Sequence, residues 1–363
     1  MDENTPKKVA VLYSKLSGFT LACLRALRDR HDIELLVFYW LPNREIAPYD
    51  LEKMLDIKRS YIREDYKSNE IINKLEEFSP DAICMSGWMD KGYLRAGRYF
   101  KERGVPVIAF VDNQWKGTLK QWGGVIISPY FLHRSIDILW PAGERQAQLS
   151  RRLGYRGNKM WYGFLSCDWH KFALIGEKRR KGKKKSFLYT GRYVESKGLK
   201  NLVQAYSIYR SEVDDPWVLH CAGSGPLNHI LQNVEGIVNY GFVQPDEIAE
   251  LFRSSGAFVL PSLREPWGVV IHEATASGLP VICAESAGAG VHLVQDGYNG
   301  FRYDTYNIDE LVKCMIRMSS LTQEHLDEMG ERSRELSKQF TPERWSDTLV
   351  NGVKEFYQNN SGY

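Results

Sequence analysis

Several patterns are missing from this 363-residue sequence, and each absence excludes a class of protein. The six cysteines form no CxxC pair and the eight histidines form no HxxxH or similar cluster, so we expect buried free thiols rather than disulfides, and no metal site. No run of 18 apolar residues predicts a transmembrane helix, and residues 1–14 lack the apolar stretch of a signal peptide. We therefore expect a soluble cytoplasmic protein, with a peripheral position at the inner face of a membrane as an alternative.

The sequence also has little excess charge of either sign. Hydrophobic residues make up 43% and charged residues 26%, as in globular proteins, and the net charge of +3 does not indicate nucleic acid as a partner. The exception is local, because seven of the eight residues from Lys178 to Lys185 are basic. Such a run is usually a solvated linker or an exposed edge. A patch that faces anionic lipid headgroups and a nuclear signal are the alternatives.

Apolar runs of strand length alternate with segments of helical spacing along the chain, which is typical of buried parallel sheets with helices on their faces. In the first half, the predicted strands lie within residues 8–14, 33–40, 81–87, 105–112, 125–129 and 137–142. In the second half, they lie within residues 186–192, 217–225, 236–243, 256–262, 279–286 and 300–304. The last 55 or so residues are predicted to be helical.

This alternation predicts an α/β protein with two Rossmann-like doubly wound domains that face each other across a cleft, followed by C-terminal helices. The expected parts are a first domain at 1–172, a basic linker at 173–186, a second domain at 187–340 and a final helix at 341–363 that packs back on the first domain. Thr341 suits the N-cap of that helix. Ligands of such sheets bind outside the carboxyl ends of the strands.

Two cations and two glycines follow predicted strands of the second half. Arg192 and Lys197 come after a strand that ends near Thr190, where they could neutralise a diphosphate without a metal; two solvated loop cations are the alternative. Gly223 and Gly225 follow the next strand. They permit close approach of the backbone to a ligand, although an ordinary tight turn has the same pattern.

The stretch REPWGVVIHEATASGLPVI, residues 264–282, combines two carboxylates with a predicted helix start. The helix is expected to begin near Gly268 and to end at Ser277. Backbone N–H groups at its start favour an anion. Glu265 lies just outside the helix and Glu273 inside it, which suggests phosphate at the helix start with a hydroxyl-bearing group on either side. A helix-start carboxylate and a surface glutamate are the alternative.

Four segments together resemble a known family. GRYVESKG, CAGSGPL, SLREPWGVVIHEATASGLPVI and DGYNGFRYD have the order and spacing of the retaining glycosyltransferases of family 4, which have the GT-B fold. The resemblance is specific over residues 186–317 and weaker over residues 8–170. It implies a bacterial-type hexosyltransferase of surface-glycan or lipopolysaccharide assembly. Its donor would be a nucleotide-diphosphate-sugar, with a UDP-sugar favoured over a GDP-sugar, and it would need no metal or other cofactor.

The resemblance also implies roles for single residues. Arg192 and Lys197 would bind the donor's diphosphate and Glu265 the donor sugar, so these three form the expected catalytic group. Glu273 would hold the ribose. The other expected donor-binding residues are Trp267 and Gly268 beside phosphate or sugar, Gly223 beside the ligand, Gly241, Phe242 and Val243 beside the base, and Gly18, Asp112 and Asn113 from the first domain.

The sequence departs from the family pattern at three places. Asp112 or Asn113 stands where many relatives have a histidine that meets the donor sugar, so only a contact is carried over. His292 stands where a glutamate is common, and the loop before Gly18 has fewer glycines than usual. These departures bear on the identity of the sugar more than on the reaction.

Two segments of the first half are rich in groups that bind sugars. Residues 86–94, SGWMDKGYL, and 112–122, DNQWKGTLKQW, contain Trp88, Trp115 and Trp122. Aromatic faces pack on sugar rings and amides bind hydroxyls, so these tryptophans are candidates for an acceptor site. A partly buried structural loop is the alternative.

The expected function is therefore transfer of a sugar, with retention, from a nucleotide-sugar to a glycan or lipid-linked acceptor. A nucleotide-sugar epimerase or a phosphorylase on the same fold, and a non-catalytic nucleotide-binding protein, are the alternatives. A nicotinamide dehydrogenase is disfavoured, because no GxGxxG follows the first strand. The two glutamates are not predicted to be a glycosidase acid/base pair, because one would serve the sugar and the other the ribose.

Overall fold

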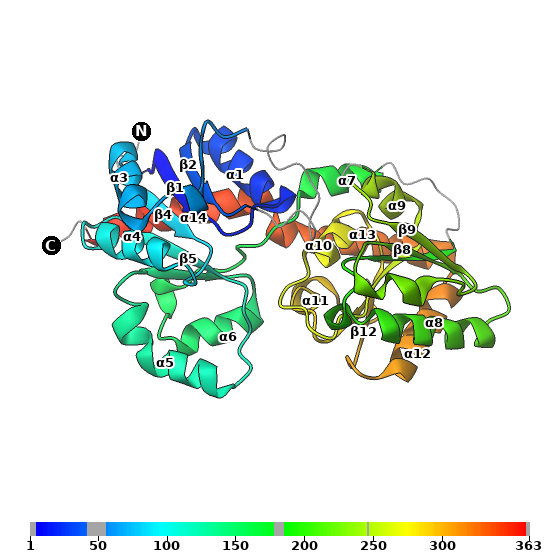
Figure 1. Cartoon of the computed structure of the whole chain (residues 1–363). Helices are drawn as coiled ribbons and strands as arrows, with labels where there is room; N and C mark the ends of the chain where they lie inside the picture. Colours follow the sequence, from blue (N-terminus) through cyan, green and yellow to red (C-terminus); the bar gives the residue numbers. More distant parts are fainter. Residues whose placement is uncertain (1–4, 42–55, 178–184, 245–246, 361–363) are drawn as a thin grey trace. The chain divides into compact units, whose positions relative to one another are not determined.

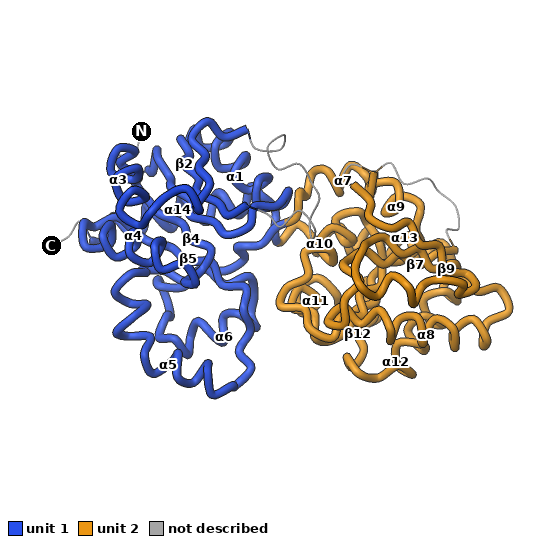
Figure 2. Tube along the Cα trace, viewed as in Figure 1, with its two compact units in different colours: residues 1–166, 340–363 blue, residues 167–339 orange. Residues whose placement is uncertain are grey.

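The computed structural model describes residues 5–41, 56–177, 185–244 and 247–360. Contacts divide the chain into two compact units, which Figure 2 colours separately: residues 1–166 with 340–363, and residues 167–339. The division falls shortly before the expected boundary at residue 172. The basic run that we interpreted as a linker lies outside the described residues, except for Lys185.

The first unit is built on a six-stranded parallel sheet with the order β3-β2-β1-β4-β5-β6. Its strands are β1 (Lys8–Leu12), β2 (Glu34–Tyr39), β3 (Arg59–Ile62), β4 (Ala82–Met85), β5 (Val107–Val111) and β6 (Ile138–Pro141). Its main helices, labelled in Figure 1, are α1 (Gly18–His31), α3 (Ser68–Phe78), α4 (Lys91–Lys101), α5 (Leu119–Phe131), α6 (Glu144–Arg152) and α14 (Pro342–Asn360).

Helices cover both faces of this sheet because alternate strand residues point to opposite sides. One face packs against α3, α4 and α6, in a core that includes Leu12 of β1. On the other face, Trp345 of α14 stacks on Trp140 of β6, with ring centroids 5.1 Å apart. α14 also lies beside α1, where Nε of Arg30 donates to Asp347 at 2.9 Å. The C-terminal helix is thus part of the first unit.

The second unit has a six-stranded parallel sheet with the order β12-β11-β10-β7-β8-β9. Its strands are β7 (Ser186–Thr190), β8 (Val218–Ala222), β9 (Ile237–Gly241), β10 (Ala257–Leu260), β11 (Val281–Ala284) and β12 (Gly300–Tyr303). Its helices are α7 (Trp169–Glu177), α8 (Leu199–Glu212), α9 (Ile248–Ser254), α10 (Val269–Ala276), α11 (Gly290–Leu293), α12 (Ile308–Ser320) and α13 (Gln323–Ser337).

Both sheets have the doubly wound order in which the chain reverses direction between the first and fourth strands. These strands are β1 and β4 in the first unit and β7 and β10 in the second. In the second unit, α8 and α12 pack on one face of the sheet. Phe252 of α9 stacks on Phe258 of β10 on the other face, with ring centroids 6.0 Å apart. The two Rossmann-like sheets confirm the predicted fold class.

Most predicted elements are confirmed, with one error and one omission. A strand lies within every predicted strand segment except 125–129, which belongs to α5. The β-branched run in that segment favours a strand locally, but Oγ1 of Thr118 caps a helix by accepting from the N–H of Gln121 at 3.3 Å. β3 was not predicted, because its four residues are exposed or only partly buried and form no apolar run.

The structure also tests the expectations about the cysteines, the N-cap of the last helix and membrane-spanning helices. All six cysteines are buried free thiols, as expected. Oγ1 of Thr341 accepts from the N–H of Arg344 at 3.3 Å, which confirms the predicted cap of the last helix. Among the residues that the structure describes, no helix combines the length and the apolar character that crossing a membrane requires.

Candidate functional site

Lys197 and Glu265 meet at the point where the second sheet reverses direction. Lys197 lies on the loop after β7 and Glu265 on the loop after β10, and these two strands are neighbours. Nζ of Lys197 donates to Oε2 of Glu265 in an ion pair whose side chains are 17% and 10% exposed. Oγ of Ser262 donates to the same carboxylate oxygen at 3.1 Å. Two predicted catalytic residues are therefore in contact, and the third member of the cluster, Ser262, was not predicted.

Backbone contacts hold these two loops in register. The N–H groups of Leu263 and Arg264 donate to the carbonyl of Ser196 at 2.9 and 3.1 Å. Gly198 has φ +68°, and a Cβ at this position would lie 1.9 Å from the carbonyl oxygen of Pro261. Only glycine fits such a close approach. The glycine after Lys197 therefore sets how near the two loops can come.

α10 begins directly beside the Glu265 side chain. Gly268 is its N-cap with φ +93°, no side chain caps the helix, and its first turn contains no acidic residue. A Cβ on Gly268 would lie 2.9 Å from Cγ of Glu265. The predicted start near Gly268 and end at Ser277 are confirmed. Uncapped N–H groups at this helix start suit an anion.

The loop after β11 supports the Glu265 loop from a second side. The N–H of Gly288 donates to the carbonyl of Glu265 at 3.1 Å, and that of Ala289 donates to the carbonyl of Trp267 at 2.8 Å. The indole of Trp267 is buried, with its ring centroid 5.8 Å from that of His292. Because the side chain of Trp267 is buried, its predicted contact with phosphate or sugar could come only from its backbone. The sequence analysis noted this loop only for His292, and its contacts with the Glu265 loop were not predicted.

Gly223 and Gly241, both predicted to bind the donor, contact each other. The N–H of Gly223 donates to the carbonyl of Gly241 at 2.7 Å. A Cβ on Gly223 would lie 1.9 Å from the carbonyl oxygen of Gly191, so this glycine is required by the packing of two loops whether or not a ligand is present. Phe242 is exposed and Val243 is half-buried.

Arg192, the other predicted phosphate ligand, is exposed. The hydroxyl of Tyr189 donates to its carbonyl at 3.1 Å, which fixes the backbone at this position. Its guanidinium makes no ion pair with any residue in the described part of the chain. The loop therefore fixes the backbone at Arg192, and no ion pair within the described residues fixes its side chain.

Glu273 lies half-buried on the second turn of α10, near the N-terminal end of α7. Burial raises the pKa of Glu273 to about 7, the nearby Lys171 lowers it and Asp168 raises it. The carboxyl therefore titrates near neutral pH, well above an ordinary glutamate. The neighbours of Glu273 were not predicted, because Asp168 and Lys171 lie about a hundred residues earlier in the chain.

His272, next to Glu273, is a buried structural residue. Its Nδ1 accepts from the N–H of Cys167, and its Nε2 donates to the carbonyl of Ser337, both at 2.9 Å. Burial lowers the pKa of His272 to about 4, and the bond to Ser337 opposes this shift. The neutral imidazole thus ties α10 to the start of α7 and the end of α13, and it fixes how α10 presents its next residue.

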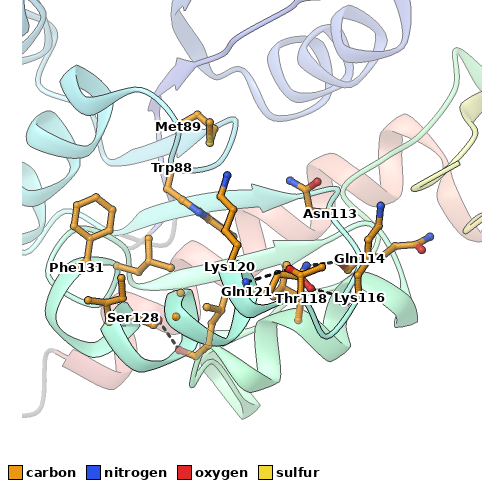
Figure 3. A pocket seen from close by; sticks show the side chains of 16 residues that line it. Trp88, Met89, Asn113, Gln114, Lys116, Thr118, Lys120, Gln121, Ser128 and Phe131 are labelled. Atoms are coloured by element: carbon orange, nitrogen blue, oxygen red, sulfur yellow. Dashed lines mark hydrogen bonds between the residues drawn. The ribbon is translucent and has the colours of Figure 1, made fainter. Parts of the chain in front are cut away.

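The first-unit residues predicted to bind the donor follow β1 and β5. Gly18 is the first residue of α1, after the N-cap Ser17. Asp112 directly follows β5 and is exposed by its surface area, and desolvation by the surrounding protein raises the pKa of its carboxyl. Asn113 and Trp88 line one pocket of about 600 Å³, shown in Figure 3.

The tryptophans predicted to bind the acceptor have different surroundings. Trp115 and Trp122 pack edge to face, with ring centroids 5.2 Å apart, and the guanidinium of Arg152 lies 4.7 Å above the ring of Trp115. This arrangement favours the structural alternative for Trp115, whereas Trp88 faces the pocket. Among the described residues, no group of three or more His, Cys, Asp or Glu side chains is placed to hold a metal ion.

A family model matches the part of the chain that contains this site, and curated relatives match about half of the chain. Residues 171–336, nearly the whole second unit, match the family model described as glycosyl transferases group 1. An uncharacterized glycosyltransferase of Haemophilus influenzae is 28% identical over 47% of this chain and 49% of its own length. One from Methanocaldococcus jannaschii is 28% identical over 46% of this chain and 44% of its own. The chain thus spans about half the length of the curated relatives it matches.

The fold of the whole chain matches solved structures at low sequence identity. HepE of Anabaena, crystallised with UDP, has a TM-score of 0.73 and 15% identity, covering 96% of this chain and 100% of that chain. Sucrose-phosphate synthase of Thermosynechococcus elongatus has a TM-score of 0.72 and 13% identity, covering 97% and 100%. These similarities establish the GT-B fold. The fold, the family model and the relatives together support a GT-B glycosyltransferase.

Proposed function

We propose that this protein is a retaining hexosyltransferase that moves a sugar from a nucleotide-diphosphate-sugar to a glycan or lipid-linked acceptor. The observation that carries the proposal is the Lys197–Glu265–Ser262 cluster beside the uncapped start of α10. It lies where doubly wound sheets bind ligands. Retention of configuration follows from the resemblance to family 4.

Charge on the departing diphosphate is the main demand of this reaction. Lys197, Arg192 and the N–H groups at the start of α10 would stabilise it, and one preorganised donor of this kind is typically worth about 3 kcal/mol, or roughly a hundredfold in rate. The ion pair with Glu265 positions Lys197. Phosphate would share that cation, and Glu265, oriented by Ser262, would accept hydroxyls of the sugar.

A UDP-sugar is the donor we propose, because the similar HepE structure contains UDP. The ribose of the nucleotide would contact Glu273, and the backbone at Gly241 and its neighbours would border the base. Arg192 and Lys197 carry the charge that would make a metal unnecessary. We place the enzyme in the cytoplasm, in contact with the inner face of a membrane when the acceptor is lipid-linked, and assign it no role with nucleic acid.

A thermal-shift screen with UDP-, GDP- and ADP-sugars tests the donor. At a hundredfold excess over Kd, a donor adds about 2.7 kcal/mol to the free energy of unfolding, and the UDP-sugars are expected to raise Tm most. A stronger response to GDP- or ADP-sugars would contradict the choice of base. Donor binding without turnover on a broad acceptor panel would favour a non-catalytic protein.

Transfer assays on Lys197→Ala test the site. We expect kcat to fall about a hundredfold, because one charge that stabilises the leaving group is lost. Lys200→Ala is the matched control, since Lys200 lies on the first turn of α8 and pairs with Glu195 at 2.6 Å on the surface. Equal activity of the two variants would refute the assignment.

Analysis of the products separates the proposed reaction from its alternatives. Anomeric NMR of the product should show the donor's configuration, and inversion would remove the retaining mechanism. Turnover without an acceptor would indicate an epimerase, and a requirement for free phosphate a phosphorylase. Activity should survive EDTA.

A further inference from the structure

α5 exposes most of its apolar side chains and contacts the first unit mainly through Ser128 and the partly buried Val125. Leu119, Trp122, Ile126 and Tyr130 recur every three or four residues, so they share one face of the helix. Leu119 is 89%, Ile126 73% and Tyr130 77% exposed. On the opposite face lies Ser128, the one residue within α5 that is buried. The apolar face is therefore turned to solvent, contrary to the usual arrangement of a surface helix.

The attachment of α5 to the first unit is slight. Oγ of Ser128 donates to the carbonyl of Leu153 at 2.8 Å, and a pocket of about 600 Å³ lies along the inner side of the helix. Figure 3 shows Phe131 and Lys116 at opposite ends of this pocket. The helix contains two glycines and Pro129, each of which disfavours a helix in water. Burial of its apolar face against this unit contributes little to its stability.

The charges around α5 are all positive. No acidic residue occurs in the sequence between Asp112 and Asp137. Lys116 precedes the helix, Lys120 lies in its first turn and Arg134 follows its end, and none of the three makes an ion pair with a residue in the described ranges. An apolar stripe with tryptophan and tyrosine, flanked by unpaired cations, complements an interface where hydrocarbon meets anionic groups.

We propose that α5 docks the protein on a bilayer surface that carries anionic headgroups. The apolar stripe (Leu119, Trp122, Ile126 and Tyr130) enters the interface. Ile127 and Phe131 lie at its edge, where the helix surface turns towards the pocket, and Lys116, Lys120 and Arg134 supply positive charge for the headgroups. The 13 residues of α5 extend about 20 Å, too short for a hydrocarbon core of about 30 Å, so the helix lies in the plane of the surface. This membrane-binding segment differs from the one considered in the sequence analysis, which was the basic run at residues 178–185.

Vesicle flotation of the full chain, without donor or acceptor, tests this docking. Vesicles of phosphatidylcholine with 30% phosphatidylglycerol, a fraction on the order of natural anionic surfaces, should bind the protein, and phosphatidylcholine alone should bind it far less. Ile126→Ser with Ile127→Ser should weaken partitioning about tenfold or more, because two apolar side chains no longer enter the interface. Lys120→Gln should weaken it about fivefold.

For each α5 substitution, a control variant removes the same kind of side chain from another part of the surface. Leu174→Ser with Tyr306→Ser removes two apolar side chains of the second unit, the latter 73% exposed like Ile126. Lys58→Gln removes an exposed cation of the first unit. These controls should bind vesicles like the parent chain. Lys183→Gln with Lys184→Gln should do so too, because both lie in the basic run.

Several outcomes would overturn the proposal. Equal binding by the α5 variants and the parent chain would do so, as would loss of binding only in the basic-run variant. Concentration-dependent dimerisation that disappears in the Ile126→Ser, Ile127→Ser variant would assign the face to a second copy. The thermal shift with a UDP-sugar should be unchanged in all α5 variants, so failure of docking and failure of the donor assignment are distinguishable.

Discussion

Glu273 makes the stability of the second unit depend on pH, and Glu273→Gln isolates that dependence. Burial raises its pKa from the ordinary 4.5 to about 7. Between these values the folded protein holds a proton that the unfolded chain has released, so stability is lost as pH rises. At about 1.4 kcal/mol per pKa unit, the loss reaches about 3 kcal/mol above pH 7.

His272, the preceding residue, acts in the opposite direction. Burial lowers its pKa from 6.5 to about 4, so the unfolded chain binds a proton in this interval that the folded protein does not. Stability from this residue is complete above pH 6.5 and decreases by about 3 kcal/mol as pH falls towards 4. The two effects offset each other between pH 4.5 and 6.5. The parent protein alone therefore hides the contribution of Glu273.

Urea unfolding, followed by tryptophan fluorescence from pH 4.5 to 8, measures the difference between the parent chain and Glu273→Gln. The two should be equally stable at pH 4.5, and the variant should be about 3 kcal/mol more stable at pH 8. Glu331→Gln, at an exposed position of α13, is the control and should show no growing difference. A variant that is no more stable than the parent at pH 8 would refute the reasoning.

The same titration affects the proposed donor site. A carboxylate accepts hydrogen bonds from both ribose hydroxyls, so the proposed role of Glu273 requires its ionised form. Donor affinity, measured by calorimetry, should fall as pH decreases below about 7, approaching tenfold per pH unit. Glu273→Gln should bind the donor more weakly and with little dependence on pH. A pH-independent affinity of the parent chain would contradict the ribose contact.

Two further predictions concern the Lys197–Glu265 cluster. Lys197→Met and Glu265→Gln should each lower the free energy of unfolding by about 2 kcal/mol, because each removes the opposite charge from a mostly buried partner. The double variant should lose at least about 1 kcal/mol less than the sum; strict additivity in urea unfolding would show that the pair does not couple. Gly268→Ala should lower kcat at least tenfold, since its Cβ would lie 2.9 Å from Cγ of Glu265. Gly297→Ala is the control, because Gly297 has φ +70° with no atom within 4 Å of an added Cβ, and should lose about 1 kcal/mol of stability with unchanged kcat. Equal kcat in both glycine variants would show that Gly268 does not position Glu265.

Local sequence patterns determined the elements of this protein. Continuous apolar runs predicted buried parallel strands, and Gly268 and Thr341 marked where two helices begin, because strand burial and helix capping depend on neighbouring residues. The same reasoning failed at 125–129. There the β-branched run met the strand pattern, but it lies on a helix that exposes Ile126 and Ile127 and packs only Val125 on the core, and neighbouring residues in the sequence do not determine that packing.

Only the tertiary structure decided which side chains meet. The ion pair joins residues 68 positions apart, and Ser262 became part of the site because its loop bends around the Glu265 carboxylate. The raised pKa of Glu273 likewise comes from burial near residues of α7. Strand order brings separate loops to one edge of a sheet, and burial then fixes the charge state of the groups there. The sequence by itself therefore determined the candidate residues. Their contacts and protonation depend on packing between distant segments, which the hydrophobic periodicity of the sequence does not specify.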